Sequence, residues 1–123
     1  MEIYIDYEFD NWNKYIEKER ANKFWAAKTK KREEDVIKYF TLGKKWDEGY
    51  PVKITFIKYF SNKQNDLDNI RLKVILDGLV KAKVIKNDNL NCIQEIIIKP
   101  VFNKKKEGIL IKIEKMEEIK YDN

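Results

Sequence analysis

Residues 52–83 decide the fold, and they read VKITFIKYF (52–60), SNKQ (61–64), NDLDN (65–69) and IRLKVILDGLVKAK (70–83). The first run places β-branched and aromatic residues on alternate positions, which is typical of a half-buried strand. The last run repeats apolar residues at the spacing of a helix with one apolar face. The residues on that face are Leu72, Ile75, Leu76, Leu79 and Ala82. The stretch therefore predicts a strand, a polar turn and a helix in succession.

The flanking sequence predicts three more strands and one long helix. Asn13–Phe40 is rich in Lys, Glu, Arg and Ala and contains no proline, so it predicts a helix, with a possible break near Arg20 to Asn22. Residues such as Phe24, Ala27, Lys31 and Glu34 recur there at helical spacing. Alternating apolar residues predict strands over Glu2–Tyr7, Cys92–Phe102 and Ile109–Met116. We interpret Asn103–Gly108, with Lys104 to Lys106, as a plain hairpin turn between the last two strands.

The order of these elements, β-α-β-α-β-β, predicts an α+β (mixed α/β) fold with a four-stranded mixed sheet flanked by two helices. With 123 residues, the chain is long enough for one hydrophobic core and too short for two. We therefore expect a single domain over residues 1–116 and a frayed tail over residues 117–123.

The composition restricts the chemistry. A net charge of +5 favours a polyanionic partner, although 21 acidic residues accompany the 26 basic ones. The absence of histidine excludes Ser-His and Cys-His triads and most zinc sites. The four glycines are too far apart for a phosphate-binding loop. Any chemistry must therefore use carboxylates and lysines, with or without a hard metal ion, and we expect no organic cofactor.

The cysteine content and hydropathy predict a cytoplasmic protein. Cys92 is the single cysteine, so no internal disulfide can form. No charged and then apolar leader opens the sequence, and no apolar run approaches the roughly 20 residues of a membrane span.

The polar turn before the second helix carries the most informative residues. Asp66 and Asp68 are two positions apart, so both carboxylates leave the same side of an extended backbone. Asp88 follows the helix and could approach them if the helix end turns back toward the sheet. Converging carboxylates need a cation, and oxygen ligands favour Mg²⁺ or Mn²⁺, which suits phosphodiester hydrolysis. The alternative is structural: Asp66 and Asp68 are also typical of helix capping, and Asp88 of a turn.

Basic residues nearby allow a functional and a structural interpretation as well. Lys73 and Asp77 lie one helical turn apart, where they could form a surface ion pair or bind and position a phosphate. The run that contains Lys28, Lys30 and Lys31 could bind DNA or simply be a solvated helix face, since three acidic residues follow it.

At this point the chain resembles the RusA-type Holliday junction resolvases of bacteria and their prophages. The resemblance rests on Asp66-Leu67-Asp68-Asn69, on Lys73 to Leu79 and on Val84 to Asp88, where the family has Asp-x-Asp-Asn, Lys-x-x-x-Asp-x-Leu and a closing Asp. Lys73 follows Asp66 by seven positions instead of the family's six, and a one-residue insertion at the helix start aligns all the blocks. Asn87 stands where a second acidic residue is frequent.

The resemblance implies a homodimer that binds a four-way DNA junction and cuts two strands symmetrically. It implies Mg²⁺, or Mn²⁺, held by Asp66, Asp68 and Asp88. Lys73 would act on the phosphate or orient the attacking water, with Asp77 and Asn69 supporting the site. The residues expected to contact DNA are Asn13, Lys14, Arg20, Lys28, Lys30, Lys31 and Lys63.

Two other functions fit the same sequence. A DNA-binding protein could keep this fold and lose the chemistry, in which case it would bind junctions without nicking them. A protein-interaction module with capped helices would show no salt-dependent affinity for DNA.

Overall fold

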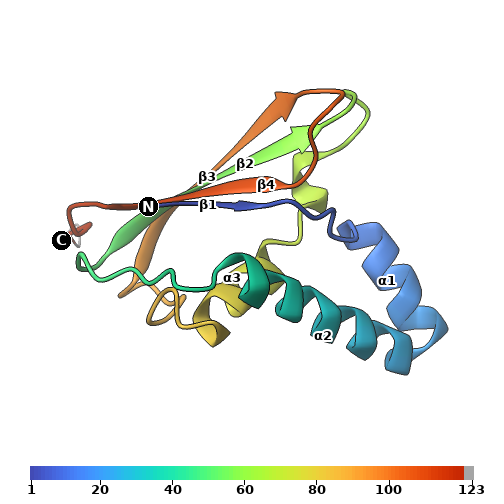
Figure 1. Cartoon of the computed structure of the whole chain (residues 1–123), viewed down its shortest axis with the longest axis horizontal. Coiled ribbons are helices and arrows are strands. Elements are labelled where there is room, and N and C mark those ends of the chain that lie inside the picture. Colours follow the sequence, from blue (N-terminus) through green and yellow to red (C-terminus); the bar gives the residue numbers. More distant parts are fainter. Residues whose placement is uncertain (121–123) are drawn as a thin grey trace.

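The computed structural model describes residues 1–120 of the chain. It has a four-stranded mixed sheet with the strand order β1-β4-β2-β3, and the helices lie together on one side of this sheet (Figure 1). The strands are β1 (Glu2–Ile5), β2 (Val52–Phe60), β3 (Ile93–Phe102) and β4 (Ile109–Lys115). The helices are α1 (Trp12–Ala21), α2 (Lys23–Phe40), the short 3₁₀ helix η1 (Leu67–Asn69) and α3 (Leu72–Lys81). The predicted α+β class and mixed sheet are confirmed.

The strand β2 forms the centre of the sheet. It pairs in parallel with β3 and antiparallel with β4, so Phe56 is registered with Ile98 on one side and Ile111 on the other. Because β3 and β4 lie on opposite sides of β2, the connection between them is not a hairpin, and that prediction was wrong. The segment that contains α3 carries the chain back along the sheet, so that β3 runs parallel to β2. The connection from β3 to β4 must then cross over the end of β2. Gly108 ends this crossing at φ +91°, and a Cβ there would meet the backbone oxygen of Ile5.

The predicted long helix breaks at Asn22. The side chain of Asn22 accepts a hydrogen bond from the Phe24 backbone N–H at 2.9 Å, and its own backbone N–H donates to the Lys18 carbonyl oxygen at 2.9 Å. One residue therefore ends α1 and caps α2. The break near Arg20 to Asn22 is confirmed.

Helices α2 and α3 bury one face each. The buried face of α2 consists of Ala26, Thr29, Glu33 and Ile37, while Phe24, Ala27 and Lys31 of the same helix are exposed. The buried residues of α3 are Val74, Ile75, Gly78 and Leu79, with Leu72, Leu76 and Ala82 only partly buried. A Cβ at Gly78 would lie 2.5 Å from Cδ1 of Ile37. The glycine thus allows α2 and α3 to pack closely.

The segment after β4 has no regular secondary structure as far as Lys120. The backbone N–H of Ile119 nevertheless donates to the side-chain oxygen of Gln94 at 2.7 Å. Residues 121–123 of the predicted frayed tail lie outside the described residues. Within residues 1–120, no helix has both the length and the apolar character needed to cross a bilayer.

Candidate functional site

The acidic turn connects the end of β2 to α3. Asp66 immediately precedes η1 and is exposed, and its side chain makes no capping hydrogen bond. Asp68 lies in the first turn of η1 and is also exposed. The helix α3 begins only at Leu72, after Arg71, so neither aspartate stands at the position that caps it. Asp66 instead stands at the N-cap position of η1, without a capping hydrogen bond, and Asp68 in the first turn of η1, so the capping alternative is wrong for α3 and holds only by position for η1.

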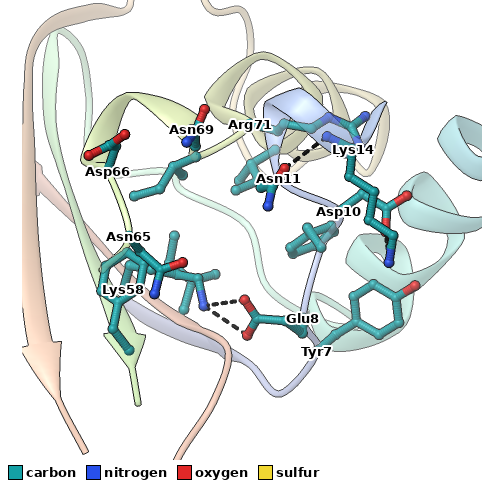
Figure 2. Close-up of a pocket in the computed structure, with 15 residues that line it drawn as sticks. Tyr7, Glu8, Asp10, Asn11, Lys14, Lys58, Asn65, Asp66, Asn69 and Arg71 are labelled. Carbon is teal, nitrogen blue, oxygen red and sulfur yellow. Dashed lines mark hydrogen bonds and ion pairs between the residues drawn. The ribbon is translucent and has the colours of Figure 1, made fainter. Parts of the chain in front are cut away.

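Asp66 lines a cleft of about 340 Å³ between the acidic turn and the segment that leads from β1 into α1. Asn65, Asp66 and Asn69 line one side of this cleft, and Tyr7 and Asp10 the other (Figure 2). The cleft places the acidic turn beside residues that are more than fifty positions earlier in the chain. The tertiary structure is what brings them together.

The floor of the cleft holds a buried lysine that the sequence analysis missed. Lys58 of β2 is 8% exposed, and its Nζ lies 2.8 Å from the Glu8 carboxylate and 3.0 Å from the Tyr59 carbonyl oxygen. The signal was present in the strand alternation, because Lys58 falls on the same face as Ile54 and Phe56, which are in the core. A charged residue at an inward position of a strand needs a partner, and here Glu8 is that partner.

Arg71 is the second buried cation beside the acidic turn. Its Nη1 donates to both carboxylate oxygens of Glu33 at 2.6 and 2.8 Å, and its guanidinium lies 4.0 Å from the centre of the Tyr15 ring. Burial raises the pKa of Glu33, although the Arg71 charge opposes this effect. These contacts join α1, α2 and the start of α3. A charged residue within the apolar run Ile70–Leu72 was the signal for this pair.

Asp10 on the far side of the cleft is also ion-paired. The Lys18 Nζ donates to its carboxylate at 2.5 Å, and the Lys14 Nζ lies 3.6 Å away. Burial acts to raise the pKa of Asp10, but the hydrogen bond and the charges of these lysines outweigh it and lower the pKa. Asp10 therefore stays ionised next to the acidic turn.

Lys73 lies on the first turn of α3 between two carboxylates. Its Nζ is 3.0 Å from Oδ1 of Asp77 and 3.8 Å from Oδ2 of Asp88. The hydrogen bond to Asp77, and then the charges of Asp77 and Asp88, raise the pKa of Lys73. The Lys73 side chain is 78% exposed, whereas those of Asp77 and Asp88 are 23% and 28% exposed. The loop after α3 thus brings Asp88, the last residue of the motif, close to Lys73.

The carboxylates can be compared with the needs of a metal ion. Over residues 1–120, no three Asp, Glu or Cys side chains are grouped closely enough to form a ligand set. Mg²⁺ is commonly bound by one or two carboxylates together with water and substrate phosphate. Asp66 and Asp68, which are exposed and separated by one residue, are oxygen donors of the type that this ion selects.

The residues expected to contact DNA divide into two groups. Lys14 lines the cleft beside the acidic turn, and Lys63 lies in the loop before it, 5.4 Å from the Phe102 ring. The others lie on α1 and α2, away from that turn in the sequence, and all are exposed: Asn13, Arg20, Lys28, Lys30 and Lys31. Of these, Lys28 contacts the rings of Phe24 and Trp25, and Lys31 is 3.4 Å from Asp35.

Comparison with protein families and with curated proteins found no match to this chain.

Proposed function

We propose that the protein is a Mg²⁺-dependent endodeoxyribonuclease that resolves four-way DNA junctions by paired, symmetric phosphodiester cuts. The observation that carries the proposal is the 3.8 Å approach of Asp88 to Lys73, fifteen residues apart in the chain. The aspartate and the lysine of the motif thereby share one end of α3, and the acidic turn stands immediately before that helix. Spatial proximity therefore supports the pairing of Lys73 with Asp88 that the sequence resemblance implies.

The roles of the residues follow from their charge and exposure. Asp66, Asp68 and Asp88 would hold the metal ion, and because they do not form a ligand set over residues 1–120, the acidic turn and Asp88 would have to approach each other when the ion binds. When bound, that ion lowers the pKa of a coordinated water and stabilises charge on the phosphate. Lys73 is exposed and positively charged, and Asp77 raises its pKa further, so it can contact a phosphate oxygen as a cation. Asp77 would hold the Lys73 side chain in place, and Asn69, at the edge of the cleft, would orient the acidic turn.

The expected partners belong to the same proposal. A four-way junction has two equivalent strands, and an isologous homodimer presents two equivalent sites to them. The exposed lysines and Arg20 on α1 and α2 would contact backbone phosphates, which position the protein without reading the sequence. We expect this activity in the cytoplasm, where recombination intermediates of bacteria and prophages form.

The proposal is tested by cleavage of an end-labelled synthetic four-way junction and of a linear duplex, each with Mg²⁺ or with EDTA. We expect paired nicks near the crossover, in the junction alone and with Mg²⁺ alone. Asp68→Asn should lower the nicking rate by at least about 100-fold while junction binding persists. Asp47→Asn is the matched control, since Asp47 is an exposed aspartate outside the motif.

Other outcomes would identify the alternatives. Tight junction binding without nicking in Mg²⁺ or Mn²⁺ would indicate a binding protein that has lost the chemistry. If neither binding nor nicking occurs, the acidic turn has no role on DNA and the proposal is wrong. Equal nicking rates for Asp68→Asn and Asp47→Asn would show that Asp68 does not belong to the site.

A further inference from the structure

A second hollow adjoins the cleft beside the acidic turn. Its volume is about 660 Å³, and it extends from the end of β2 to the connection between β3 and β4. The two hollows share Glu8, Phe60 and Asn65. The two hollows therefore adjoin each other, and we call them together the groove, which is lined by Asp66 at one end and by Lys104 to Glu107 at the other.

The far end of this groove carries three consecutive lysines, Lys104, Lys105 and Lys106. The connection that bears them crosses over the end of β2, where the Asn103 backbone N–H donates to the Phe60 carbonyl oxygen at 2.9 Å. A hairpin at this place would have projected the lysines away from β2. The crossing instead holds them beside the loop that leads to the acidic turn.

Two aromatic rings lie beneath Lys106, the last of these lysines. Tyr4 and Tyr59 meet edge to face at 6.1 Å, and the Lys106 Nζ lies 4.8 and 4.5 Å from their centres. A lysine held over aromatic rings keeps its charge at a defined position, since the ring faces attract the cation. Three carboxylates, those of Asp6, Glu8 and Glu107, line the same hollow. Glu8 is paired with Lys58 at 2.8 Å, so Asp6 and Glu107 oppose the three lysines and leave one net positive charge.

We propose that this groove binds the backbone of the DNA strand that carries the cleaved phosphate, with Lys104, Lys105 and Lys106 as its phosphate contacts. The inference rests on the proposed action on DNA and extends the interface beyond α1 and α2. The strand follows the groove from the acidic turn, passes Asn65 and ends over the lysines. Contacts of this kind fix the position of a strand without reading its bases.

The test measures binding of a labelled four-way junction in EDTA, where no cutting occurs, over a series of salt concentrations. The variant Lys104→Gln, Lys105→Gln, Lys106→Gln removes three positive charges from the groove. We expect its affinity to fall at least about tenfold, and the slope of log K against log salt to fall by about 2 to 3, since each phosphate contact contributes roughly 0.7 to 0.9.

The matched control is Lys44→Gln, Lys45→Gln, Lys83→Gln. These lysines are exposed and lie in the segment that precedes β2 and in the turn after α3, whereas the groove lies at the end of β2. The control changes the net charge equally, so it reports the long-range electrostatic effect alone. Its slope should change by less than about 1. Thermal melts of both variants check that the fold is intact.

The outcomes separate this inference from the proposed nuclease activity. Equal losses of affinity and slope in the two variants would contradict the proposed DNA binding by the groove, even if the wild type nicks junctions. A loss of affinity and slope in the groove variant alone, with no nicking by the wild type, would support DNA binding by the groove and contradict the proposed nuclease activity. A wild type without salt-dependent affinity for DNA would overturn both.

Discussion

Arg71 and Lys73 are two residues apart, yet their charges are in opposite environments. The Arg71 side chain is 4% exposed and is held by Glu33 and the Tyr15 ring. The Lys73 side chain is 78% exposed and lies between Asp77 and Asp88. The difference arises because Arg71 precedes the first turn of α3 and points toward α2, whereas Lys73 lies on the outer face of the same helix.

The comparison separates a charge that stabilises the fold from one that can act on a ligand. A buried ion pair contributes to stability mainly through the penalty that follows when one partner is removed. An exposed pair contributes little, because water and salt screen it. Arg71 should therefore affect the stability of the protein, and Lys73 its activity.

The largest expected effect is on stability at Arg71. Arg71→Ala leaves the Glu33 carboxylate buried without its partner, and we expect the free energy of unfolding to fall by about 3–5 kcal/mol. Urea denaturation followed by circular dichroism measures this change. Lys73→Ala is the control and should leave the midpoint of the transition almost unchanged.

A double substitution tests whether the missing partner is the cause. Glu33→Leu with Arg71→Leu removes both charges, so the loss of stability should be much smaller than for Arg71→Ala. If the double variant is as unstable as the single one, packing of Arg71 and not its charge is responsible.

The next effect is on activity at Lys73. If Lys73 contacts the cleaved phosphate, Lys73→Met should slow single-turnover nicking of the junction by about 100-fold with an unchanged melting temperature. Lys58→Met is the informative comparison, because Lys58 is buried in the cleft and paired with Glu8. A rate that depends on Lys58 and not on Lys73 would assign the phosphate contact to β2.

A smaller effect is expected at Tyr15. Its ring covers the Arg71 guanidinium, so Tyr15→Leu should lower the free energy of unfolding by about 1–2 kcal/mol, less than Arg71→Ala does. The same urea titration measures it. Phe24→Leu, which changes an exposed aromatic residue on α2, serves as the control.

The smallest effect is on the titration of Lys73. Its pKa is raised by Asp77 and Asp88, so its ammonium should lose its proton only above the ordinary lysine range, and Asp77→Asn should move the pKa back down. NMR of the labelled lysine side chains measures this pKa.

The raised pKa of Lys73 also makes stability depend on pH. Its contribution to the free energy of unfolding is fully present below the ordinary lysine pKa near 10.5, and it is lost as the pH rises through the pKa of the folded state. An unchanged pKa in Asp77→Asn would contradict the observed pair.

Local patterns were sufficient for most of the elements. The bounds of β2 follow from its alternation of β-branched and aromatic residues, and the break at Asn22 from a capping residue within a helical run. The connection of residues 103–108 was misread, because two strands joined by a short polar turn usually pair with each other. Here β2 occupies the place between them.

Local sequence patterns identified only part of the candidate site. Asp66, Asp68 and Asp88 stand out as acidic residues in the turns around a strong helix, and Lys73 as part of the motif that resembles a known family. Glu33 and Lys58 did not stand out, although both occupy inward positions of a helix and a strand. Each is tolerated there because a partner distant in the chain neutralises it, and a single sequence does not identify that partner.

The sequence by itself determined which segments become strands and helices, since propensity, capping and periodicity act over a few neighbouring residues. It also determined that any chemistry depends on carboxylates and lysines. Only the tertiary structure decided which charges are buried and which are free, and that the lysines of residues 104–106 adjoin the acidic turn. The physical reason is that burial and pairing depend on contacts between distant segments, which the packing of the sheet against α2 and α3 creates.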